Sequence, residues 1–166
     1  MTVIKGVLIP ADEDKPIELV EFDQSDLKAM QGYVGGWIQA VEGFRPPCTF
    51  IMNEEGKVNN LPLNRRGTLA LWVHHAEFID RDVLVGDVLL VGPADEETGD
   101  QLGVPDELVE LLFNTEKYRY LVKTIGENGW HGNGIVLDDP WKAYNDALGL
   151  ARRWTLVERV RVVAAA

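Results

Sequence analysis

Hydrophobic and polar positions divide the chain into short segments, most of which have the length and composition of β-strands. Residues 2–9 form an apolar run that Pro10 ends, and residues 17–22 follow after a polar turn, so this pair predicts a β-hairpin. The remaining predicted strands are residues 37–41, 48–52, 82–91 and 154–163.

Helices are predicted where apolar residues recur about every 3.6 positions behind a capping residue. Ser25 is the expected N-cap of a helix that ends at Gly35, and Asn64 is the expected N-cap of a shorter one. Pro105 suits the first position of a third helix, and Asp139 precedes a proline at the start of a fourth. Residues 118–125 fit either a helical extension or another strand.

These elements alternate irregularly, and several strands follow one another closely enough to be hairpin partners. That order favours an α+β fold over a parallel α/β sheet. We therefore expect a single compact domain with a mainly antiparallel or mixed sheet and three to four helices.

Short motifs in the first 92 residues carry a family resemblance through their order and spacing. They are residues 7–12, 18–20, 34–41, 53–57, 61–68 and 85–88. The chain resembles an uncharacterised domain family of actinobacteria and their phages. The resemblance implies a family-like core over residues 1–92, with residues 93–166 as a C-terminal extension packed on the same domain. It implies no activity and no catalytic residues, but suggests an accessory protein of a phage or mobile element.

Charge narrows the function further. The 166 residues include 27 acidic and 16 basic side chains, so the net charge is −11. Such an excess argues against direct binding of nucleic acid or of an anionic membrane surface. The chain has no apolar run of about 20 residues and no signal-peptide pattern, so we expect a cytoplasmic protein.

An anion site is one interpretation of the segment Asn64-Arg65-Arg66-Gly67-Thr68. Guanidinium groups match phosphate and carboxylate geometry, and a helix that starts here adds backbone N–H donors. The alternative is that Asn64 caps the helix while both arginines pair with nearby acids. Adjacent residues do not share a helix face, so the two arginines need not serve one ligand.

Metal binding and nucleophilic catalysis have little support in the sequence. His74 and His75, with Glu77 and Asp80, lack the spacing of zinc ligands, and Cys48 is the single cysteine. Cys48 begins an apolar strand and is expected to be a buried, inert thiol. We therefore predict no metal, no cofactor and no enzymatic activity.

A glycine-rich loop at residues 126–134 contains Trp130 and His131. It lacks the lysine of a phosphate-binding loop. It is either an exposed recognition tip or an ordinary turn with Trp130 in the core.

Acidic residues are concentrated between residues 93 and 110, where the net charge is −7, while residues 152–161 carry +3. A 30 Å face that imitates duplex DNA needs roughly 18 charges. The 27 acids are spread over every segment beside 16 bases, which argues against a complete monomeric mimic but leaves a partial mimic or a dimer with a continuous acidic face. The seven acids are Asp95, Glu96, Glu97, Asp100, Asp106, Glu107 and Glu110.

Three functions follow from these features as hypotheses. The first is a phage-type accessory protein that binds and modulates a host protein, and the second is a partial DNA mimic. The third is a binder of a small anionic ligand or nucleotide that uses Arg65 and Arg66. Five tryptophans and four tyrosines also keep a homodimer open.

Overall fold

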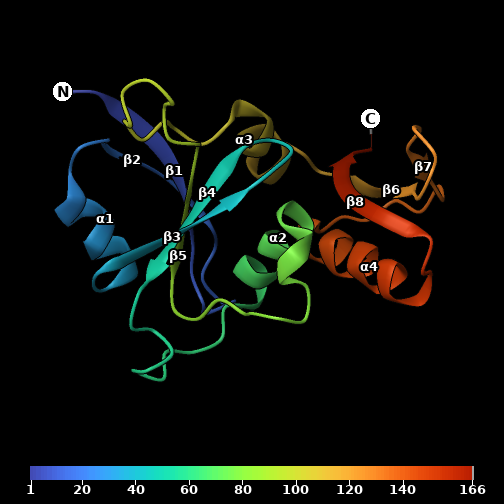
Figure 1. Cartoon of the computed structure of the whole chain (residues 1–166), viewed down its shortest axis with the longest axis horizontal. Helices are drawn as coiled ribbons and strands as arrows, with labels where there is room; N and C mark the ends of the chain where they lie inside the picture. Colours follow the sequence, from blue (N-terminus) through green and yellow to red (C-terminus); the bar gives the residue numbers. More distant parts are fainter. Residues whose placement is uncertain (166) are drawn as a thin grey trace. The chain divides into compact units, whose positions relative to one another are not determined.

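The computed structural model describes residues 1–165, which form four helices and eight strands in two antiparallel sheets (Figure 1). The predicted α+β class is therefore confirmed. The chain divides into two compact units, one of residues 1–109 and one from residue 110 onward. Within the described residues, no helix has the length and apolarity needed to cross a lipid bilayer.

The first unit is built on a five-stranded sheet in the order β2-β1-β5-β4-β3. The predicted hairpin at the N-terminus is confirmed, because β1 and β2 pair antiparallel with Ile4 opposite Phe22. A second hairpin joins β3 to β4, and β5 completes the sheet between β1 and β4. The strands are β1 (Val3–Ile9), β2 (Glu18–Asp23), β3 (Ile38–Gly43), β4 (Cys48–Asn53) and β5 (Val88–Val91).

Two helices cover opposite faces of this sheet (Figure 1). Helix α1 (Leu27–Val34) places Met30 and Val34 in a buried cluster with Leu89 and Val91 of β5. Helix α2 (Arg65–His74) lies on the other face, where Gly67 approaches Val88 closely enough that an added Cβ would sit 3.3 Å from it. A single turn of 3-10 helix, η1 (Ala76–Phe78), follows α2.

Two of the sequence predictions in this unit were wrong in detail. The strand expected over residues 82–91, with a kink or turn at Gly86-Asp87, is limited to β5. The interruption is present, since Gly86 adopts a left-handed φ of 72°, but the residues before it do not form a strand. The N-cap of α1 is Asp26, not Ser25. The Ser25 hydroxyl instead donates to Asp23 Oδ1 (2.9 Å), while the Asp26 carboxylate accepts from the Ala29 N–H (3.0 Å).

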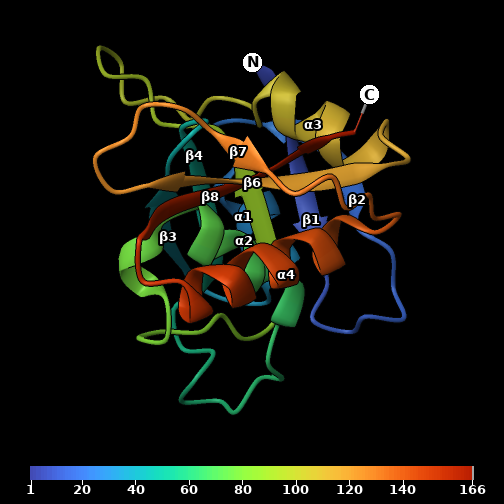
Figure 2. The same ribbon diagram turned by 90° about the vertical axis from the view of Figure 1, so that its right-hand side faces the viewer.

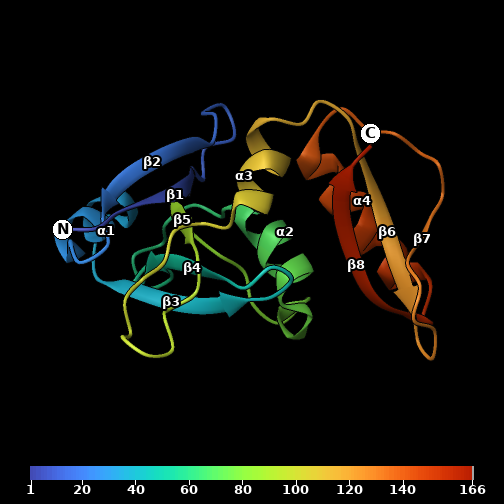
Figure 3. The same cartoon turned by 90° about the horizontal axis from the view of Figure 1, so that it is seen from above.

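The second unit is a three-stranded sheet in the order β7-β6-β8 with a helix on one face (Figures 2 and 3). Residues 118–125 were left open by the sequence, and all of them except Ile125 form a strand. Asp139 caps the last helix as predicted, since its carboxylate accepts from the Trp141 N–H. The elements are β6 (Tyr118–Thr124), β7 (His131–Gly132), α4 (Pro140–Arg153) and β8 (Val157–Ala164); α3 (Asp106–Phe113) spans the division between the units.

Candidate binding surfaces

The Asn64–Thr68 motif holds the first unit together at the start of α2. The Asn64 side chain is fully buried: its Oδ1 accepts from the Gly67 N–H (2.8 Å), and its Nδ2 donates to the carbonyls of Ile9 (2.8 Å) and Gly86 (2.9 Å). The Thr68 hydroxyl donates to the Asn64 carbonyl and accepts from the Leu84 N–H. This cap therefore joins β1, α2 and the chain before β5.

Arg66 is also buried, and its side chain binds the turn after β1. Nη2 lies within hydrogen-bonding distance of the carbonyl oxygens of Pro10 (2.8 Å), Asp12 (3.1 Å) and Lys15 (2.9 Å). One guanidinium nitrogen thus holds three points of residues 10–15, an arrangement that we call the Arg66 clamp.

Arg65, the neighbouring arginine, lies at the surface. Its Nε donates to Glu13 Oε1 (3.0 Å), and the hydrogen bond lowers the pKa of the Glu13 carboxyl. The two arginines therefore reach the same turn by different routes, Arg66 through backbone oxygens and Arg65 through a carboxylate. Asn64 and Arg65 match the alternative interpretation, in which Asn64 caps the helix and the arginines pair with nearby acids. Arg66 departs from it, because the three oxygens bound by its Nη2 are backbone carbonyls and not acids.

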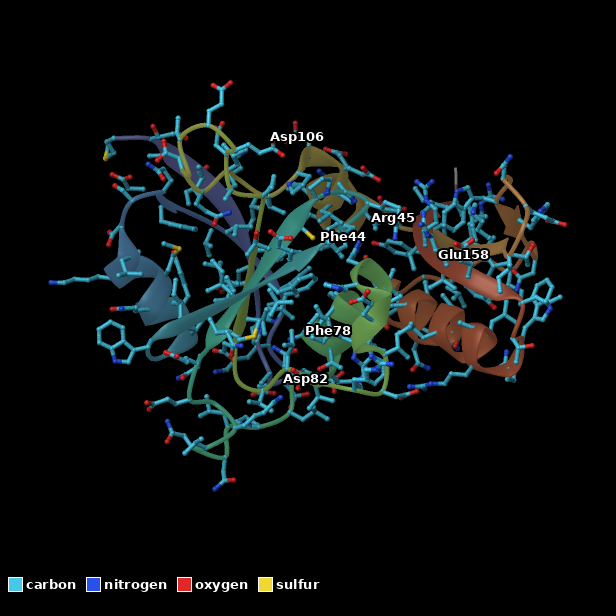
Figure 4. All side chains as sticks on the ribbon, in the orientation of Figure 1. Phe44, Arg45, Phe78, Asp82, Asp106 and Glu158 are labelled. Carbon is cyan, nitrogen blue, oxygen red and sulfur yellow. The ribbon has the colours of Figure 1, made fainter. Side chains whose placement is uncertain are left out.

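Two of the three histidines, His74 and His75, lie where α2 ends, and Cys48 lies nearby. His74 is buried, its Nδ1 lies 3.0 Å from the Phe44 carbonyl oxygen, and burial lowers its pKa. The His75 ring lies edge-on to Phe44 and Phe78, whose rings flank this end of the helix (Figure 4). Burial raises the pKa of the Cys48 thiol to about 12, so the thiol stays protonated at neutral pH. Within residues 1–165 no group of three or more potential ligands is placed to hold a metal ion.

A small depression lies beside β3 and β4. It has a volume of about 110 Å³, and its lining includes the ion pair of Lys57 and Asp82. Pockets for drug-sized ligands measure roughly 300–1,000 Å³, so this one is small for a nucleotide. Its lining residues are Gln39, Val41, Met52, Asn53, Glu54, Lys57, Asp82, Val83, Leu84 and Val85.

The acidic segment forms a turn followed by the first part of α3. Asp95 Oδ1 accepts from the N–H groups of Glu97 (2.8 Å) and Thr98 (3.0 Å), and these bonds lower the pKa of Asp95. Asp106 and Glu107 occupy the first turn of α3, where the helix dipole favours acids. The other acids of the segment, Glu96, Glu97, Asp100 and Glu110, are exposed.

The acid excess belongs to one unit of the chain. Residues 1–109 carry 20 acidic and 8 basic side chains, a net charge of −12. Residues 110–166 carry 7 acidic and 8 basic side chains, a net charge of +1. The overall value of −11 is therefore the sum of a strongly acidic unit and a nearly neutral one.

Trp130 and His131 lie at β7, at the edge of the second sheet. Trp130 is half-buried, and the guanidinium carbon of Arg161 lies 5.5 Å from its ring centre. His131 is exposed, with its Nε2 3.0 Å from a Glu127 carboxylate oxygen. Trp130 thus stacks on a strand residue, an arrangement between an exposed tip and a core side chain. These two residues belong to a different unit from Arg65 and Arg66.

The second sheet has a basic face that the sequence analysis did not identify. On β6, Tyr118, Tyr120 and Val122 are buried, so the alternate residues Arg119, Leu121 and Lys123 point to the opposite face. Register places Leu121 opposite Arg161 and Lys123 opposite Arg159, so the cations of both strands share this face. We call it the basic face; it comprises Arg119, Leu121, Lys123, Arg159, Arg161 and Val163, with Trp130 over Arg161.

A scan of family models identifies residues 4–117 as DUF3846, a domain of unknown function. The chain belongs to this family. The DUF3846 match extends past residue 92 and includes the acidic segment and α3, whereas β6, β7, α4 and β8 follow it. Comparison with curated proteins and with solved structures gives no significant match to either set. The basic face therefore lies on the part of the chain that the DUF3846 model does not cover.

Proposed function

We propose that this protein is a non-enzymatic, phage-type accessory protein that binds and modulates a protein in the cytoplasm of an actinobacterial host. The side chains best suited to catalysis have structural roles instead. Arg66 binds backbone carbonyls, His74 is buried, and the Cys48 thiol is protonated. These roles support binding rather than catalysis.

The observation that carries the proposal is the separation of charge between the units. A basic face that combines arginines with Trp130 and Leu121 has the composition of a protein-binding surface, where Arg and Trp are enriched. It follows a first unit, residues 1–109, whose net charge is −12. A basic face in the same chain as a strongly acidic unit suits a protein that recognises a particular partner better than one that binds polyanions in general.

The test is affinity capture by the full-length protein from an actinobacterial lysate, with the captured proteins quantified. We expect a partner that soluble protein competes away and that is lost as salt rises, because charge complementarity is screened. Absence of any saturable protein partner would refute the proposed function.

Partial DNA mimicry is a second candidate, favoured by the exposed acids of the 93–110 segment. Its test is the variant Asp95→Asn/Glu96→Gln/Glu97→Gln/Asp100→Asn, in which the amide oxygen introduced at position 95 can still accept the two turn hydrogen bonds. If mimicry is the function, this variant loses inhibition of a DNA-binding target, and unchanged inhibition removes the idea. The control neutralises four acids elsewhere in the same unit: Glu18, Glu21, Glu54 and Glu55.

A further inference from the structure

Strand β8 is an edge of the second sheet, since β6 is its neighbour on one side and the sheet ends on the other. The Ala165 N–H donates to the Lys117 carbonyl (2.8 Å), which fixes the phase of the antiparallel ladder. Counting back by two, residues 163, 161 and 159 exchange hydrogen bonds with β6. The N–H and C=O groups of Val160 and Val162 therefore point away from β6, toward the edge.

Side chains along this edge alternate between two environments. Val160 and Val162 are buried on the face that α4 covers, as are their partners Val122 and Tyr120. Arg159 and Arg161 lie on the basic face. A strand added to the edge would place every second side chain beside an arginine and the others beside the valine positions.

We propose that the edge of β8 binds an extended, acidic protein segment by antiparallel strand addition, with acidic and apolar residues alternating along that segment. This inference rests on the proposed function, because it specifies the partner segment that the protein recognises. Residues opposite Val160 and Val162 form the hydrogen-bonded pairs, so residues opposite Arg159 and Arg161 form the closer, non-hydrogen-bonded pairs. Carboxylates at those positions meet the guanidinium groups at short range.

Local charges on the strand strengthen the selection of acids. Lys123 lies directly opposite Arg159, and like charges in that position are destabilising. An irregularity in register between Lys123 and Thr124 allows Glu158 to reach Lys123 (3.0 Å), which offsets part of the repulsion (Figure 4 labels Glu158 on β8). A carboxylate from a partner beside Arg159 would offset more of it.

Nucleic acid is the competing polyanion, and the charge distribution disfavours it. A nucleic acid strand carries charge along its whole length, so it is repelled by the net charge of −12 that the same chain carries in residues 1–109. A protein segment can confine its acids to the few positions that face Arg159 and Arg161. The competing role for Arg159 and Arg161 is to prevent strand addition, because charged side chains on an edge strand often do so. Absence of peptide binding would favour that role.

The experiment titrates full-length protein with a fluorescein-labelled heptapeptide of alternating Glu and Val, at 50 mM NaCl, and follows fluorescence anisotropy. We expect saturable binding with a dissociation constant below about 200 µM, typical of weak peptide recognition, and backbone amide shifts at Val160 and Val162 by NMR. The test variant is Arg159→Glu/Arg161→Glu, which should weaken peptide binding at least about tenfold. The matched control is Arg152→Glu/Arg153→Glu, an equal charge change on α4 that should leave the dissociation constant within about twofold.

Three further probes test whether binding needs backbone hydrogen bonds and acidic side chains. A peptide of the same sequence with N-methylated valines loses the donors that pair with the edge and should not bind. A peptide of alternating Lys and Val, and a twelve-residue oligothymidylate, should bind less tightly than the Glu–Val peptide. No saturable binding, equal binding of the N-methylated or Lys peptide, or tighter binding of the oligonucleotide would each overturn strand addition.

Failure here can be separated from failure of the proposed function. If the wild-type protein captures a saturable partner and the Arg159→Glu/Arg161→Glu variant captures it equally, the β8 edge is wrong and the function stands. If the wild-type protein captures none while the peptide binds at β8, the edge is correct and the proposed function is wrong.

Discussion

Arg66 and Arg65 offer a sharp test of how the first unit is stabilised, because two adjacent residues of one type make opposite kinds of contact. Substitution by methionine keeps most of the aliphatic length and removes the guanidinium. Arg66→Met leaves the carbonyls of residues 10, 12 and 15 without their shared donor inside a buried contact. Arg65→Met breaks an ion pair whose side chains are both 47% exposed.

The expected losses of stability for the two variants differ enough to be told apart. The two N–H groups of Arg66 Nη2 can make two strong bonds at once, and each charge-assisted hydrogen bond contributes about 1.5 kcal/mol or more. Arg66→Met should therefore lower the free energy of unfolding by about 3 kcal/mol. Arg65→Met should lower it by less than about 1 kcal/mol, because an exposed pair is screened by solvent.

Urea unfolding, followed by tryptophan fluorescence and by circular dichroism, measures both changes. With a denaturant slope of about 1.5 kcal/mol/M, the Arg66→Met midpoint should fall by about 2 M. Two variants whose unfolding free energies agree within about 0.5 kcal/mol would refute the Arg66 clamp as a stabilising contact. If Arg66→Met keeps the wild-type free energy of unfolding but loses binding of a ligand or partner, Arg66 would have a recognition role instead.

Other predictions concern the end of α2 and the segment around it. Burial lowers the folded-state pKa of His74 below 6.5, so the unfolded chain binds more protons and stability should fall as pH drops below about 6.5. The measurement is the urea midpoint from pH 7.5 to 5.5, and His74→Gln should reduce its dependence on pH. Cys48 should react with Ellman's reagent in 6 M urea but hardly at all in buffer at pH 8, because the native thiol is buried and has a pKa of about 12. Gly43→Ala should lower the thermal midpoint in a melting curve by several degrees, since an added Cβ would lie 2.7 Å from Cys48 Sγ; an unchanged midpoint would show that β3 and β4 can separate there.

Local signals in the sequence predicted local structure well where one residue type has one dominant use. Asn64 and Asp139 were recognised as caps because each precedes a helical pattern, and both side chains accept the expected N–H. Ser25 failed because Asp23 and Asp26 compete within the same four residues, and Asp23 accepts the hydroxyl. Choice among neighbouring caps depends on the entry path of the chain, which the pattern does not contain.

The division into two units was not predictable from composition. It falls between Val109 and Glu110, inside α3, so no linker of glycine, proline or polar residues marks it. The sequence also did not identify β6 as a strand, because its alternation of buried and exposed residues is obscured. Leu121 lies on the basic face between Tyr120 and Val122, so three apolar residues in succession conceal the period of two that burial reveals.

The net charge shows most clearly why the basic face was missed. The sum of −11 excluded polyanion binding for the chain as a whole, and the +3 of residues 152–161 was counted along the sequence. Only the antiparallel register brings Arg159 and Arg161 beside Lys123 and Leu121, and only the break at residue 109 separates these cations from the acids. A charge counted per chain describes solubility, whereas a charge counted per sheet face describes which partner can approach it. The partner binding that we propose for this DUF3846 protein should therefore be sought at the face of its second sheet and not inferred from its total charge.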